Sequence, residues 1–169
     1  IEELGDHEGE LDVDRSPRPR TLYSVCKTLL REYAEYITRR AAVRVDWFRP
    51  FVVYGPGQRG QMLIPSAFQA AVSGQPCDFS DGLQCRDFLF VEDLARWLRL
   101  ALGFPAEAKG FRLHHLGTGT GVPVRDALEI IREEFPGAPF HLGARSRRPG
   151  EPMMQRAPVY PSGDDGAGA

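Results

Sequence analysis

Apolar side chains recur about once per helical turn from Tyr23 to Arg40, with charged and polar residues between them. The recurring positions are Val25, Leu29, Leu30, Tyr33 and Ile37. Spacing near the helical period is typical of an amphipathic helix with one apolar stripe. The pattern therefore predicts a helix over residues 23–40.

Further along, strand-like and helix-like segments alternate. Val43, Val45 and Trp47 alternate with Arg44 and Asp46, which indicates a strand over 41–48. Other expected strands span 51–54, 77–79, 87–90, 111–116 and 140–142. Expected helices span 62–73, 92–102 and 122–135, the second turning Leu94, Trp97, Leu98 and Ala101 inward. Such alternation predicts an α/β fold.

Both ends of the chain lack such a pattern. Residues 1–20 are acidic and then rich in Pro and Arg, which predicts a surface loop. The chain begins at Ile1 without an initiator methionine, which suggests a fragment. Residues 155–169 have little apolar content, and we expect a disordered tail there.

Composition narrows the class of protein. A hydrophobic content of 42% supports a folded domain, and the net charge of −2 leaves no basic stripe for nucleic acid or a membrane surface. Cys26, Cys77 and Cys85 lack metal-ligand spacing and suggest reduced thiols in a cytoplasmic protein. No metal site is expected, because the neighbours His114 and His115 face opposite sides of a strand.

Tyr23 and Lys27 lie one turn apart on the first predicted helix. An ammonium group beside a phenol stabilises the phenolate, so this pair is a candidate general acid/base. The same spacing also occurs by chance on many solvated helices, and spacing alone leaves both interpretations open.

Several motifs follow this pair in order. They are Tyr23-x-x-x-Lys27, the run from Arg49 to Gln58, Gly82-x-x-x-Arg86-Asp87-Phe88, the run from Leu116 to Gly119, and the run from Arg148 to Met153. Together they resemble the C-terminal part of an extended short-chain dehydrogenase/reductase. The resemblance is to the NAD-dependent epimerase/dehydratase family of nucleotide-sugar enzymes.

The resemblance implies the last part of a Rossmann-like parallel sheet in residues 1–60 and a smaller α/β, mainly substrate-binding region in 61–154. By this resemblance, the N-terminal cofactor-binding half of such an enzyme is expected to lie outside this chain. It also implies an enzyme that moves a hydride and a proton at a sugar carbon, as an epimerase, dehydratase or 4-ketoreductase using NAD or NADP. A fragment of this kind is expected to have little or no activity alone. A non-catalytic nucleotide-sugar-binding module, or degraded paralogue, is the alternative.

By the same resemblance, Tyr23 is the acid/base, and Lys27 binds the nicotinamide ribose and lowers the pKa of Tyr23. Pro50 and Val52 contact the cofactor, and Val52 stands where the family often has a substrate-contacting Asn. Arg86 and Arg148 would bind the diphosphate of a nucleotide sugar, for which guanidinium is well suited; the alternative is that both are surface arginines. The motif from Arg148 to Met153 resembles the 4-ketoreductases of deoxysugars, and a homodimer is implied.

One competing interpretation concerns the glycines. The run from Gly55 to Gly60 fits G-x-G-x-x-G, follows a strand and precedes a helix, as a dinucleotide-binding loop does. The resemblance instead places this run after the catalytic helix, over the substrate. The two interpretations differ in whether the isolated chain binds NAD.

Overall fold

Two long parallel strands form the centre of the fold in this computed structural model, which describes residues 1–103 and 109–159. Strand β2 (Arg44–Pro50) pairs with β7 (Gly110–Leu116), from Arg44 opposite Gly110 to Pro50 opposite Leu116. Shorter β3 (Val52–Tyr54) pairs in parallel with β6 (Phe88–Phe90). Parallel strands joined through helices confirm the predicted α/β fold.

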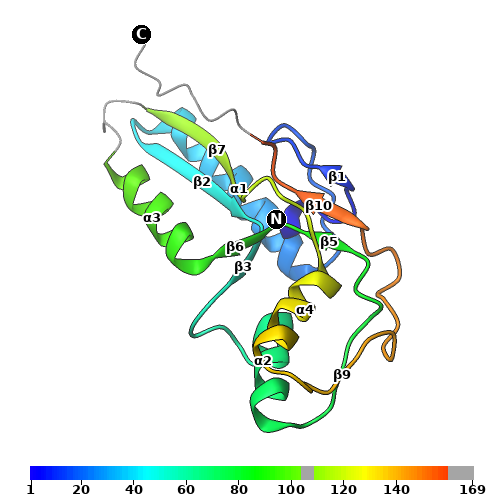
Figure 1. Ribbon diagram of the computed structural model, residues 1–169. Coiled ribbons are helices and arrows are strands. Elements are labelled where there is room, and N and C mark those ends of the chain that lie inside the picture. Colours follow the sequence, from blue (N-terminus) through cyan, green and yellow to red (C-terminus); the bar gives the residue numbers. More distant parts are fainter. Residues whose placement is uncertain (104–108, 160–169) are drawn as a thin grey trace.

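Helix α1 (Leu22–Arg40) packs on β2 and β7 and lies behind them in Figure 1. Its inward side carries the buried polar residues Ser24 and Thr28. Its apolar stripe faces away from the sheet, so that Leu22 is 80% and Tyr33 is 60% exposed. The predicted helix is present, but its apolar face is not covered by any described residue.

Helix α3 (Val91–Leu102) contacts β3 and β6 and contains no buried residue. The expectation that its apolar residues turn inward is therefore wrong for Trp97 and Leu98, which are 54% and 38% exposed. The period of the pattern gave the helix correctly. The pattern could not show that no other described segment packs over the apolar side of this helix.

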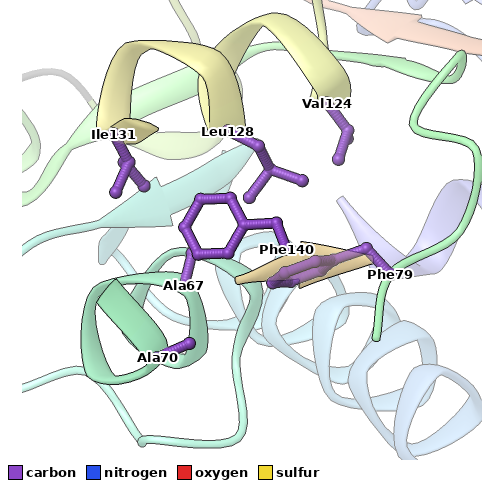
Figure 2. Packing of buried hydrophobic residues seen from close by; sticks show 7 residues of the cluster. All are labelled: Ala67, Ala70, Phe79, Val124, Leu128, Ile131 and Phe140. Carbon is purple, nitrogen blue, oxygen red and sulfur yellow. The ribbon is translucent and has the colours of Figure 1, made fainter. Parts of the chain in front are cut away.

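A second packed region lies beside the paired strands and is built around α2 (Leu63–Ser73) and α4 (Val124–Glu134). The side chains of Figure 2 fill the space between these helices and β4 (Cys77–Asp78) and β9 (Phe140–His141). Phe79 and Phe140 meet edge to face with ring centroids 5.5 Å apart. The core comprises Ala67, Ala70, Phe79, Val124, Leu128, Ile131 and Phe140.

The beginning and end of the described chain meet in one small sheet. Its strands run in the order β1 (Gly9–Glu10), β10 (Met154–Arg156), β5 (Cys85–Arg86) and β8 (Val122–Pro123). Only β5 with β8 is antiparallel. The domain division proposed at residue 60 is therefore crossed by strand pairing, here and between β2 and β7.

This sheet corrects two expectations. Residues 1–20 are not simply a surface loop, because Leu4 and Leu11 are fully buried and η1, a 3₁₀ turn, spans Glu2–Leu4. The disordered tail was placed too early, because β10 includes Gln155 and Ala157 is 1% exposed. Backbone pairing and neighbouring apolar side chains order these polar segments. Residues 160–169 of the expected tail lie outside the described residues.

Among residues 1–103 and 109–159, no helix combines the length and apolar character needed to cross a membrane.

Candidate functional site

Tyr23 and Lys27 occupy one face of α1 near its start. The start is fixed by a capping box, in which Ser24 N–H donates to Thr21 Oγ1 at 3.1 Å and Thr21 N–H donates to Ser24 Oγ at 2.9 Å. Lys27 Nζ lies 5.5 Å from the centroid of the Tyr23 ring. The spacing in the sequence therefore brings phenol and ammonium together, within reach of one bound molecule.

Both side chains line a cavity of about 390 Å³ beside β2. Glu2 and Glu3 of η1 and Pro50 at the end of β2 complete much of its wall. Pro50 thus lies in the same cavity as the Tyr23–Lys27 pair. Val52 lines neither this cavity nor the second one described below, and its N–H donates to the carbonyl of Asp87 at 2.9 Å.

A buried carboxylate supports this first cavity. Glu3 accepts hydrogen bonds from Trp47 Nε1 at 2.9 Å and from Arg49 Nε and Nη2 at 3.2 and 2.9 Å. Arg31 Nε on α1 lies 3.3 Å from Glu3 Oε2, close enough for an ion pair but not aligned as a hydrogen bond. Glu3 thus links η1, α1 and β2 next to Tyr23 and Lys27.

A second cavity of about 360 Å³ brings Arg86 and Arg148 together. Arg86 Nη1 donates to the carbonyls of Cys85 and Pro152 at 2.8 and 2.9 Å, and its Nη2 donates to Glu151 Oε1 at 2.7 Å. Burial lowers the pKa of the Arg86 guanidinium and Glu151 opposes that change, but arginine stays charged in proteins. Arg148 is exposed at the cavity wall, so the pair offers two cations to an anionic ligand.

Glu2 lines both cavities. The Tyr23–Lys27 pair and the Arg86–Arg148 pair are therefore neighbouring parts of one surface, although they are far apart in the sequence. The chain begins in the centre of the molecule, near the end of β2 (Figure 1), where the backbone nitrogen of Ile1 donates to the carbonyl of Pro50 at 3.0 Å.

Sequence reasoning missed Glu2, Glu3, Asp6 and Arg20 as residues of these cavities. All four fall in a segment without helical or strand period, which gave no signal beyond its charge. Arg49 is 2% exposed and was noted only as part of a motif. The available signal was a charged residue between two predicted strands, 41–48 and 51–54, because a buried charge requires a partner.

Both glycine-rich runs make close contacts within the fold. In the first, Gly55 packs so tightly that a Cβ would lie 2.5 Å from Val91 Cγ1, and Gln58 N–H turns back to the carbonyl of Gly55 at 3.3 Å. In the second, Thr118 N–H and Gly119 N–H donate to the carboxylate of Asp87 at 2.7 and 2.9 Å. These donors are already used within the fold.

No cluster of three or more His, Cys, Asp or Glu residues suited to a metal ion occurs among residues 1–103 and 109–159. His114 Nε2 lies 2.9 Å from Asp46 Oδ1, whereas His115 Nδ1 lies 2.9 Å from the carbonyl oxygen of Leu11. The two neighbouring rings thus have separate partners.

Comparison with known proteins identifies the family. The sequence profile of the NAD dependent epimerase/dehydratase family matches residues 2–117, and the chain belongs to this family. It is 29% identical to CDP-abequose synthase of Salmonella typhimurium over 139 residues, which cover 80% of this chain and 46% of that protein. It is 30% identical over 150 residues to UDP-glucose 4-epimerase of Rhizobium meliloti, covering 80% of this chain and 45% of that protein.

Solved structures show the same relationship. The chain resembles MoeE5 in complex with UDP-glucuronic acid and NAD, with a TM-score of 0.82 and 31% identity over 94% of this chain and 53% of that chain. The chain thus spans about half the length of the relatives it matches. The predicted family and the Rossmann-like relationship of the fold are confirmed.

Proposed function

We propose that this chain is the C-terminal part of a nucleotide-sugar epimerase, dehydratase or 4-ketoreductase and holds its substrate. The observation that carries the proposal is the pair of cavities that share Glu2. Arg86 and Arg148 would hold the diphosphate in one cavity. The sugar would then extend past Glu2 towards Tyr23 and Lys27 in the other.

In this arrangement Tyr23 would move a proton at a sugar hydroxyl or carbonyl oxygen, with Lys27 beside it stabilising the phenolate. Pro50 and Val52 are proposed cofactor contacts, Val52 on the resemblance alone. NAD or NADP, when bound, would exchange the hydride with the sugar carbon. The complex of the similar protein MoeE5 with NAD supports NAD as the first choice.

The residues present fit only one end of such a dinucleotide. Tyr23 and Lys27 line an open cavity that could receive a nicotinamide ribose. In both glycine runs, backbone N–H groups that could bind a dinucleotide diphosphate are already used within the fold. We therefore expect the isolated chain to bind nucleotide diphosphates but not NAD.

Calorimetric titration of the chain with UDP, CDP, NAD and NADP tests this proposal, with circular dichroism as the check of folding. We expect UDP or CDP to bind and NAD and NADP not to bind. Arg86→Ala and Arg148→Ala should each weaken nucleotide binding by about ten- to a hundredfold, the range of a charge-assisted hydrogen bond. Arg145→Ala, an exposed arginine outside both cavities, is the matched control.

NAD binding that Gly57→Val abolishes would overturn this proposal in favour of a freestanding dinucleotide-binding protein. A folded chain that binds none of the four nucleotides would overturn it as well.

Catalysis needs a separate test, because the chain spans about half of its relatives. Adding the N-terminal half of a related enzyme should restore turnover of a nucleotide sugar, and Tyr23→Phe should abolish it. A mixture that binds nucleotide sugar but never turns it over would favour the non-catalytic module.

We propose the cytoplasm as the location of this protein. The three free thiols, at Cys26, Cys77 and Cys85, are compatible with it.

We also propose a homodimer formed through the outer face of α1. Large apolar side chains recur along that face at the spacing of a helix-packing seam, and each is at least half exposed. They are Leu22, Leu29, Tyr33 and Tyr36. A continuous apolar stripe of this kind typically marks an interaction surface.

A further inference from the structure

The second cavity has two walls of different charge. Arg86 and Arg148 stand on one wall, with Glu151 paired to Arg86. Glu2 and Asp6 stand on the other wall, which η1 and the residues after it form and which leads to the Tyr23 cavity. The part of the lining that would receive a diphosphate therefore carries two cations and one carboxylate, and the part with Glu2, which also lines the Tyr23 cavity, carries two carboxylates.

Arg20 lies between these walls. Its Nη1 donates to Asp6 Oδ2 at 3.5 Å and to the carbonyl of Gly150 at 3.4 Å. Gly150 permits this approach, since a Cβ there would lie 2.6 Å from Arg20 Nη1. The Arg20 and Asp6 side chains remain 54% and 42% exposed, so each keeps hydrogen-bonding capacity free for a ligand.

A sugar hydroxyl suits this wall because it can donate to a carboxylate and accept from a guanidinium. A sugar carboxylate would have to lie near two like charges, since Arg20 already pairs with Asp6, Arg86 and Arg148 are assigned to the diphosphate, and Lys27 lines only the Tyr23 cavity. We infer that Glu2, Asp6 and Arg20 form the sugar-recognition wall of this protein and select a nucleotide sugar with an uncharged hexose over one with an acidic sugar. This inference rests on the proposed function and specifies its substrate class.

The inference is tested by calorimetric titration of the chain with UDP, UDP-glucose and UDP-glucuronic acid near pH 7.5, where the carboxylates are ionised. We expect UDP-glucose to bind more tightly than UDP-glucuronic acid. The double variant Glu2→Gln/Asp6→Asn should move the ratio of the two affinities towards UDP-glucuronic acid by about three- to tenfold, a range set by partly exposed charges. Both ligands carry the same UDP part, so any change in the binding of the diphosphate cancels in this ratio.

Two controls separate this effect from others. Glu8→Gln removes an exposed carboxylate of the same segment outside both cavities and should leave the ratio unchanged. Arg20→Ala should lower the affinity for UDP-glucose but not the affinity for UDP, because Arg20 is assigned to the sugar. An equal loss of UDP affinity would make Arg20 a phosphate ligand and overturn its assignment.

The inference would be overturned if the unmodified chain bound UDP-glucose and UDP-glucuronic acid equally, or if the double variant left the ratio of their affinities unchanged. In either case, binding of UDP would leave the proposed function intact. Failure to bind UDP at all would overturn both.

Discussion

Glu3 and Arg49 form a buried ion pair, with Arg49 Nη2 2.9 Å from Glu3 Oε2 and side-chain exposures of 6% and 2%. The pair joins the start of the chain to the end of β2, beside the Tyr23 cavity. A buried charge that loses its partner is strongly destabilising. The stability of this region therefore depends on both residues together.

Glu3→Ala should lower the free energy of unfolding by about 3–5 kcal/mol, because it leaves Arg49 buried without its carboxylate. Urea unfolding followed by circular dichroism measures the change. Replacing both partners, as in Glu3→Leu/Arg49→Met, should recover most of the loss, since no unpaired charge remains. Glu32→Ala, exposed on α1, is the control. Glu3→Ala with the same free energy of unfolding as the unmodified chain would contradict this role of the ion pair.

Asp87 is fully buried and accepts from Thr118, Gly119 and Ala157, so that it ties β6 to the loop after β7 and to the end of β10. In Asp87→Asn, the side-chain NH₂ group would face backbone N–H donors and could not accept their hydrogen bonds. We expect a loss of about 3 kcal/mol, the cost of unmet hydrogen bonds to a buried charged group. Asp93→Asn, an exposed carboxylate at the start of α3, should change urea unfolding little. Similar midpoints for both variants would count against this role of Asp87.

His115 should make the protein less stable in mild acid. Desolvation by burial lowers the pKa of His115 to about 4, and the charge of Arg49 acts in the same direction, although the carbonyl of Leu11 opposes it. The unfolded chain binds this proton near pH 6.5, so stability falls between about pH 6.5 and pH 4 by about 3 kcal/mol. His115→Gln should flatten this part of the stability curve in urea unfolding. A curve of unchanged slope would refute the assignment to His115.

The exposed apolar stripe on the outer face of α1 leads us to expect that the chain forms a dimer. Leu29→Glu/Tyr33→Glu places two charges in the apolar stripe and should convert a dimer into a monomer in sedimentation velocity, with the helical content unchanged. Glu32→Lys alters the charge of the same helix at an exposed polar position and should leave the dimer intact. A monomeric unmodified chain would exclude the dimer proposed here.

Local pattern was enough to predict the main elements of this fold. The periods around α1, α2 and β2 were strong, and their observed ends differ little from those predicted. The short strands β1, β5, β8 and β10 were not predicted. Each is too short to show a period, and each exists only because a distant segment supplies its hydrogen-bonding partner.

The sequence by itself determined the α/β class, the shared helical face of Tyr23 and Lys27, and the motifs that identify the family, because these depend on spacing along the chain. Only the tertiary structure decided that Arg86 and Arg148 share a cavity and that Glu3 is buried against Arg49. It also decided which side of α1 faces the sheet. Such relationships join residues far apart in the chain, and no local pattern of polarity encodes the partner that folding brings to each of them.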